Sequence, residues 1–181
     1  MVVKYLAGNR LWGTDAERTA VIWNTSGTEG TFSLSGTDNQ TAHKTSGGSG
    51  SWQTAFCLGS SAIGTANQTF KFSVNASNTH IASGISTISN LEAGNTDQDA
   101  FDWGFYLKAD GNYLVYVDGT AETSDATYTT STTFQIDLTP TSIIFKVNDV
   151  VVHTETTHLP NSGTTYNIAW NIYDTASTQL T

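Results

Sequence analysis

Charged residues are scarce in this sequence, and cysteine is nearly absent. Only 13% of the 181 residues are charged, about half of the roughly 25% found in an average soluble domain. The single cysteine, Cys57, excludes an intrachain disulfide. Its apolar neighbours Ala55, Phe56 and Leu58 predict that Cys57 is a small buried side chain.

Basic residues are the rarer of the charged types, because 7 Lys and Arg stand against 16 Asp and Glu, for a net charge of −9. Nucleic acids and anionic membrane surfaces both require clusters of Lys and Arg, so neither is an expected partner. The opening Met1–Tyr5 precedes no long apolar stretch, which predicts neither a secretory signal peptide nor membrane insertion.

Threonine, serine, asparagine and glycine take the place of the missing charges. A neutral surface rich in hydroxyl groups is typical of exported and virion proteins. We therefore expect a virion or extracellular surface location. The chain would reach it either after loss of a signal peptide or by release with an assembled particle.

Apolar residues recur at every second position along most of the chain, which is the pattern of strands with one buried face. No segment has a convincing 3.6-residue period, so we expect almost no helix. Trp103 and Trp170 fall in the apolar register and are predicted to lie in the core. The alternating runs are Phe70–Val74, Phe101–Leu107, Tyr113–Val117, Phe134–Leu138, Ile143–Val147, Val150–Val152 and Tyr166–Ile172.

Turn residues separate these runs. Asp110-Gly111 and Asp118-Gly119 each follow an apolar run, and Asn148-Asp149 predicts a two-residue hairpin turn with positive φ at both residues. The first third is less regular. Short strands are predicted there over residues 4–7, 19–23, 32–34 and 51–58, with a Gly/Ser-rich loop over residues 46–51.

Many short antiparallel strands predict an all-β antiparallel sandwich or jelly roll. Three stretches resemble the concanavalin A-like lectin/glucanase sandwich, especially its SPRY-like and laminin-G-like modules. They are Thr69–Val74 with His80–Ile85, Gly104–Gly119, and Thr133–Leu138 with Ile143–Thr154.

The resemblance implies a single domain over residues 1–181, with a family-like core in residues 69–177 and less regular strands in residues 1–68. Two positions depart from the family pattern. Asp149 stands where relatives usually have glycine, and Ser131-Thr132 stands where Gly-Asp often precedes a strand. The opening residues 5–19 also resemble the start of β-sandwich proteins from marine viruses and archaea.

Enzymatic hydrolysis is not expected. Glucanases of this fold carry Glu-x-Asp-x-x-Glu on one strand, because retaining chemistry needs two carboxylates about 5 Å apart. None of the glutamates here has a second acidic residue at matching spacing within a strand, and no Gly-x-Ser-x-Gly motif occurs.

Acidic residues at short spacing offer a candidate metal site. Asp97, Asp99 and Asp102 share one loop, and carboxylates so placed suit the six to eight oxygen ligands of calcium. A solvated acidic turn is the alternative. A transition-metal site at His153, Glu155 and the following His158 is a second possibility, although histidines in a threonine-rich strand are more often solvated.

Sugar binding needs an aromatic ring beside amide or carboxylate groups. The candidates are Trp12, Trp52, Tyr106, Asn112 and Tyr113. The sequence thus predicts a non-catalytic surface protein that acts by self-assembly and adhesion, with copies of itself and cell-surface glycans as partners. A calcium-supported lectin or carbohydrate-binding module is the alternative, and a glycoside hydrolase is a more distant one.

Overall fold

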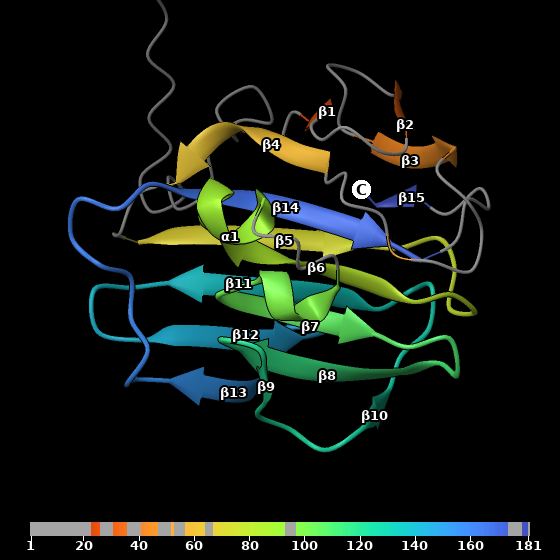
Figure 1. Cartoon of the computed structure of the whole chain (residues 1–181). Helices are drawn as coiled ribbons and strands as arrows, with labels where there is room; N and C mark the ends of the chain where they lie inside the picture. The colour runs from red at the N-terminus through yellow and green to blue at the C-terminus, as the bar shows by residue number, and fades with distance from the viewer. Residues whose placement is uncertain are drawn as a thin grey trace, which may run out of the picture.

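A computed structural model describes residues 23–25, 31–35, 41–46, 52, 57–63, 67–92, 97–173 and 179–180. The described residues form antiparallel sheets (Figure 1). The large sheet has eight strands, with β9 (Thr120–Ala121) paired to β8 outside the main order. That order is β1 (Trp23–Thr25), β4 (Cys57–Ile63), β14 (Tyr166–Ile172), β6 (Ile81–Ser86), β7 (Trp103–Leu107), β8 (Asn112–Val117) and β10 (Ala126–Thr127).

The small sheet has four strands in the order β13 (Val150–Glu155), β12 (Ile143–Val147), β11 (Thr133–Leu138) and β5 (Gln68–Ser73). A further three-stranded sheet contains β15 (Gln179–Leu180), β3 (Thr41–Ser46) and β2 (Thr31–Ser35).

The core lies between the large and small sheets, where the alternating apolar residues meet. Phe105 of β7 contacts Phe72 of β5 and Phe145 of β12, with ring centroids 6.1 and 5.5 Å apart. Edge-to-face packing of this kind adds to the area that aromatic rings bury. The predicted core tryptophans, Trp103 and Trp170, are both fully buried. The all-β sandwich that the sequence predicts is therefore confirmed.

The predicted turns are also confirmed. Asn148 and Asp149 have φ of 50° and 63° and join β12 to β13. Gly111 and Gly119, with φ of 79° and 74°, close the turns that follow β7 and β8.

Two short helical segments cover the outer face of the large sheet, the face that points away from the core. They are α1 (Ile88–Glu92) and the 3-10 turn η2 (Gln98–Ala100) (Figure 1). Leu91 of α1 and Ala100 of η2 pack on Ala82 and Ala169 of the sheet. Neither segment was expected from periodicity, because one turn is too short to repeat a pattern. Among the described residues, no helix is long and apolar enough to cross a membrane.

In the first third, the strand predicted over residues 32–34 is confirmed within β2. β4 begins at Cys57, within the strand predicted over residues 51–58, of which residues 51 and 53–56 are not described. Polar β3 was not predicted. The strand expected over residues 19–23 is described only at Trp23, which begins β1. The strand expected over residues 4–7, most of the 46–51 loop and the side chain of Cys57 lie outside the described part of the chain.

Candidate functional site

Aromatic side chains gather on the outer face of the large sheet. Tyr106 of β7 and Tyr116 of β8 alternate with buried core residues and therefore point outward. Their ring centroids lie 5.9 Å apart. Trp52 lies 6.3 Å from Tyr106 and 5.7 Å from Tyr173, measured between ring centroids. We call Trp52, His80, Tyr106, Tyr116 and Tyr173 the outer aromatic cluster.

His80 connects two members of this cluster. Its ring stacks on Tyr106 with an interplanar angle of 18°, and its Nδ1 shares a 2.8 Å hydrogen bond with the Tyr106 hydroxyl. Burial raises the pKa of Tyr106, and the neighbouring Tyr116 raises it further. The phenol therefore stays neutral at physiological pH. All five rings are half-buried, so the cluster is held in place and still reaches the surface.

The structure brings together two of the predicted sugar-binding residues, Trp52 and Tyr106. Asn112 lies on the same outer face of β8 and is half-buried. Tyr113 is a correction, because the alternation of β8 turns its ring into the core, where it is 6% exposed. Trp12 lies outside the described residues.

The predicted acidic loop does not place its three aspartates around one point. Asp97 caps η2 by accepting a hydrogen bond from the Asp99 main-chain N–H at 3.1 Å. Burial raises the pKa of Asp99, and the charge of Asp97 raises it further. Among the described residues, the carboxylate of Asp102 groups instead with Asp118 and His158. The reason is that Asp97 and Asp99 belong to the 3-10 turn η2 as its N-cap and its second residue, whereas Asp102 lies beyond the end of that turn.

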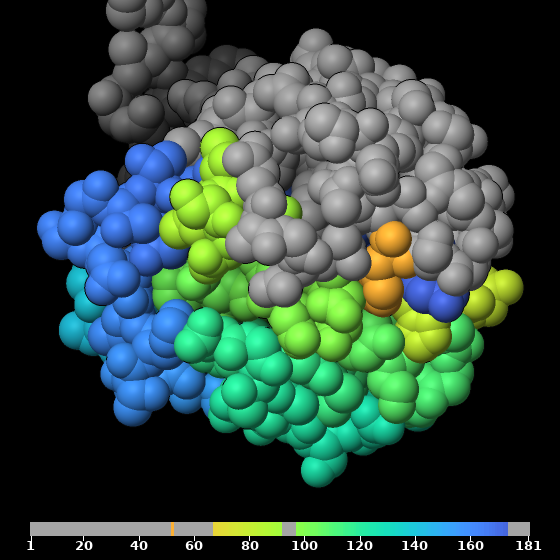
Figure 2. Space-filling view, in the orientation of Figure 1, coloured from red at the N-terminus to blue at the C-terminus, as the bar shows by residue number. Residues whose placement is uncertain are grey.

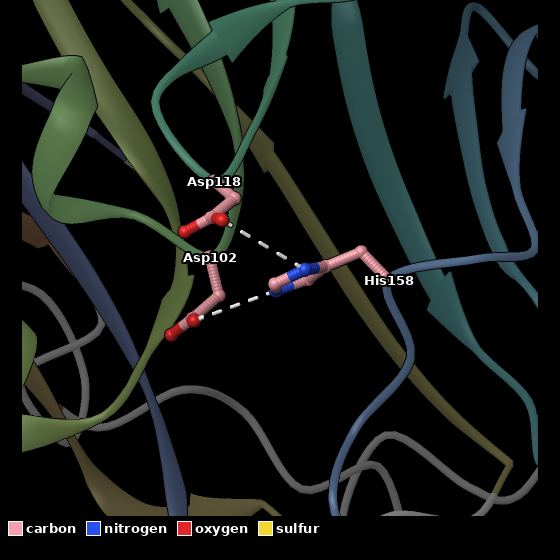
Figure 3. A group of neighbouring side chains, drawn as sticks. All are labelled: Asp102, Asp118 and His158. Atoms are coloured by element: carbon pink, nitrogen blue, oxygen red, sulfur yellow. Dashed lines mark ion pairs between the residues drawn. The ribbon is translucent and has the colours of Figure 1, made fainter.

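Asp102, Asp118 and His158 lie at one end of the large sheet (Figure 3). Nε2 of His158 is 3.8 Å from Oδ1 of Asp102, and its Nδ1 is 4.0 Å from Oδ2 of Asp118. We call these residues the Asp-Asp-His cluster. The His153, Glu155 and His158 set considered from the sequence does not appear as a three-ligand group among the described residues.

Glu155 instead supports the main chain next to His158. Its Oε1 accepts hydrogen bonds from the Thr157 hydroxyl at 2.6 Å, from the His158 N–H at 2.8 Å and from the Thr157 N–H. Burial alone would raise the pKa of Glu155, but these hydrogen bonds outweigh burial and lower it to about 2. The carboxylate is thus a charged structural acceptor at neutral pH.

No described strand carries a pair of acidic residues. The acids within strands are Asp137 of β11 and Glu155 of β13, and both belong to the small sheet. Hydrogen bonds donated by Lys146, Thr69 and Gln135 outweigh burial and lower the pKa of Asp137. Because both acids within strands belong to the small sheet, the described strands of the large sheet carry no acidic side chain, and their outer face is aromatic and neutral.

A shallow depression lies beside α1 on the same side of the molecule. It has a volume of about 290 Å³ and is lined by Thr87, Ile88, Ser89, Thr164, Thr165 and Asn167. Figure 2 views the molecule from this side, with α1, η2 and β8 facing the reader. Five of the six residues that line the depression carry a hydroxyl or an amide group, and none of the six is charged.

No protein-family model and no curated protein matches the sequence. Solved structures do match. The TRIM65 PSpry domain aligns with a TM-score of 0.64 at 13% identity, covering 90% of this chain and 88% of that one. The SPRY domain of human HERC1 gives 0.52 at 16% identity, covering 77% and 85%. A Bacillus licheniformis β-glucanase gives 0.50 at 11% identity, covering 90% and 88%.

At these identities the likeness establishes the fold. This likeness agrees with the two face-to-face sheets and the aromatic core of the structure. It also agrees with the hairpins, which include the stretches that carry the sequence resemblance. The chain therefore has the concanavalin A-like β-sandwich fold that SPRY domains and this β-glucanase share.

Proposed function

We propose that this domain is a non-catalytic module of a virion or extracellular surface that adheres to glycans through the outer aromatic cluster. The observation that carries the proposal is the placement of Trp52 and Tyr106 together on the outer face of the large sheet. Aromatic rings offer an apolar face together with a polar edge, which suits a sugar ring with its apolar C–H face and its hydroxyl groups.

The uncharged strands beneath the outer aromatic cluster support a carbohydrate over a charged ligand. These strands bear no Lys, Arg, Asp or Glu on their described residues. A hydroxyl-rich surface suits weak contacts that gain strength by repetition on a particle or cell. The absence of an acidic pair on any described strand favours binding over hydrolysis.

Glycan binding is tested by screening an immobilised glycan library and then titrating the best glycan by calorimetry. Trp52→Ala and Tyr106→Ala should each weaken binding by about five- to thirtyfold, because each removes a ring contact of about 1–2 kcal/mol. Thr141→Ala is the matched control, since Thr141 is exposed in the turn between β11 and β12 of the small sheet.

Equal affinity of all three variants and the parent would contradict the proposal. Binding lost in EDTA would favour the calcium-supported lectin. Release of reducing sugar from a β-glucan would favour the hydrolase.

Self-assembly is a second proposed role, supported by the edge of the small sheet. β13 is the outermost strand of that sheet, and Val150 and Val151 are 65% and 53% exposed on it. An exposed apolar edge strand is a template for pairing with another chain. Light scattering should find an oligomer that Val151→Lys dissociates, and a monomeric parent protein would refute this role.

A further inference from the structure

The Asp-Asp-His cluster joins three segments that are distant in the sequence. Asp102 directly precedes β7, Asp118 occupies the turn between β8 and β9, and His158 follows β13 (Figure 3). One ligand atom from each residue lies within 4.8 Å of the other two. The cluster therefore presents two carboxylates and one imidazole to a common point.

Asp102 is held rigidly. It is 9% exposed, and its carboxylate accepts hydrogen bonds from the Ser86 hydroxyl at 2.7 Å and the Thr87 N–H at 3.2 Å. The Asn90 side-chain amide donates to both oxygens, at 3.2 and 3.1 Å. A carboxylate oxygen can accept more than one such bond, so Oδ1 retains acceptor capacity toward His158.

The backbone of His158 is fixed at both its polar groups. Its N–H donates to Glu155 at 2.8 Å, and its carbonyl accepts from the Trp103 indole Nε1–H at 2.9 Å. Its ring packs on the Trp103 ring with centroids 5.6 Å apart. The imidazole keeps an open side, since the side chain is 38% exposed.

Negative charge at this end of the sheet has little basic compensation among the described residues. The lysines whose side chains the structure describes pair elsewhere: Lys71 with Asp149, Lys108 with Asp110 and Asp125, and Lys146 with Asp137. His158 is the basic group placed near Asp102 and Asp118. A buried carboxylate normally has a cationic partner or a metal ion beside it.

We propose that the Asp-Asp-His cluster binds a divalent transition-metal ion of the zinc type. An imidazole with two carboxylates is a ligand set for zinc and its neighbours, whereas calcium takes oxygen ligands alone. Zinc ligands lie about 2.0–2.2 Å from the ion, which places neighbouring ligand atoms roughly 3.3 Å apart in a tetrahedral site.

With one ligand atom taken from each residue, the three atoms lie within 4.8 Å of one another, at most about 1.5 Å more than this spacing. Asp118 can close the gap, because its side chain is 72% exposed on a turn. Three protein ligands leave a fourth position for water or for an oxygen of a bound partner. The ion also connects the segments that precede β7, follow β8 and follow β13, and so stabilises the loops at this end.

The test is calorimetric titration of the EDTA-stripped, dialysed full chain with ZnCl₂, together with the visible spectrum of the Co²⁺ form. Asp118→Asn and His158→Gln remove one ligand each. Asp149→Asn is the matched control, because Asp149 is likewise an exposed aspartate at positive φ in a two-residue turn. Asp118→Asn is the decisive variant, because Asp118 is exposed and its loss should leave folding intact.

We expect one zinc ion per chain, a tetrahedral Co²⁺ spectrum, and affinity at least about tenfold lower in both ligand variants. The control should match the parent, and zinc should raise the thermal midpoint of the parent but not of Asp118→Asn. Absence of zinc binding, or equal affinity in Asp118→Asn and the parent, would overturn the proposal. Binding of calcium but not zinc would overturn it as well.

Discussion

A methyl group added to Gly84 would clash with the main chain of the neighbouring strand. Gly84 of β6 lies opposite Gly104 of β7 in the ladder. A Cβ atom at Gly84 would lie 2.2 Å from the Trp103 carbonyl oxygen and 2.6 Å from the Gly104 Cα. Both atoms belong to the main chain, so no side-chain rotation relieves the clash.

The magnitude follows from the strand separation. A carbon atom and a carbonyl oxygen need roughly 3.3 Å, so β6 and β7 must separate locally by about 1 Å. That displacement breaks or stretches about two ladder hydrogen bonds, each contributing about 1 kcal/mol, and overpacking strain adds about 1–3 kcal/mol. We expect Gly84→Ala to lower the free energy of unfolding by about 3–5 kcal/mol, and the thermal midpoint by about 10–15 °C.

Gly104→Ala is the graded control. Its Cβ would meet the Phe101 Cβ and the Ser83 carbonyl oxygen at 3.1 Å each, distances that a small adjustment restores. It should cost about 1–2 kcal/mol in the same urea and thermal unfolding experiments. A Gly84→Ala protein within 1 kcal/mol of the parent, or equal losses for the two variants, would refute the reasoning.

Two further substitutions test the turn and the buried acid. Asp149→Gly should raise the free energy of unfolding measured in urea by about 0.5–1 kcal/mol, because a φ of 63° suits glycine. The exposed ion pair between Lys71 and Asp149, which this change removes, contributes little. A destabilised variant would contradict the prediction. For Glu155, the folded pKa of about 2 lies below the ordinary 4.5, so its stabilisation is complete above pH 4.5 and is lost as the pH falls towards 2. Measured in EDTA, Glu155→Gln should therefore lower the free energy of unfolding by about 3 kcal/mol at pH 7 and by less than half of that at pH 3. The exposed control Glu122→Gln should leave the free energy of unfolding unchanged. Equal losses for Glu155→Gln at both pH values would contradict the prediction.

Strict alternation accounts for the strands that the sequence predicts well. β8, β11 and β12 each have one face in the core and one face toward solvent, so their burial has a period of two. β6 does not, because every one of its residues is buried: the core covers one face, while α1 and η2 lie over the other. Only the family resemblance marked that strand. β3 is threonine-rich and has no apolar alternation to reveal it.

The outer aromatic cluster could be predicted only in part. Period two correctly separates outward Tyr106 from inward Phe105, because the two positions of a strand face opposite sides. The same rule places Tyr113 with Val115 and Val117 in the core, so its assignment as a ligand residue contradicts the pattern itself. His80 precedes β6 and meets Tyr106 because β6 pairs with β7, and sequence periodicity carries no information on that pairing.

The Asp-Asp-His cluster divides into a part that the sequence contains and a part that it does not. A hairpin turning at Asp110-Gly111 pairs Trp103 with Val117, and so brings Asp102 opposite Asp118. The Asp118 N–H indeed donates to the Asp102 carbonyl at 3.0 Å. Counting outward from the predicted turn would have found this pair. His158 follows β13 of the small sheet, and it reaches the two aspartates only because the chain crosses back to the large sheet at that end. That crossing depends on how the two sheets stack on their shared core, so the third ligand becomes visible only in the folded chain.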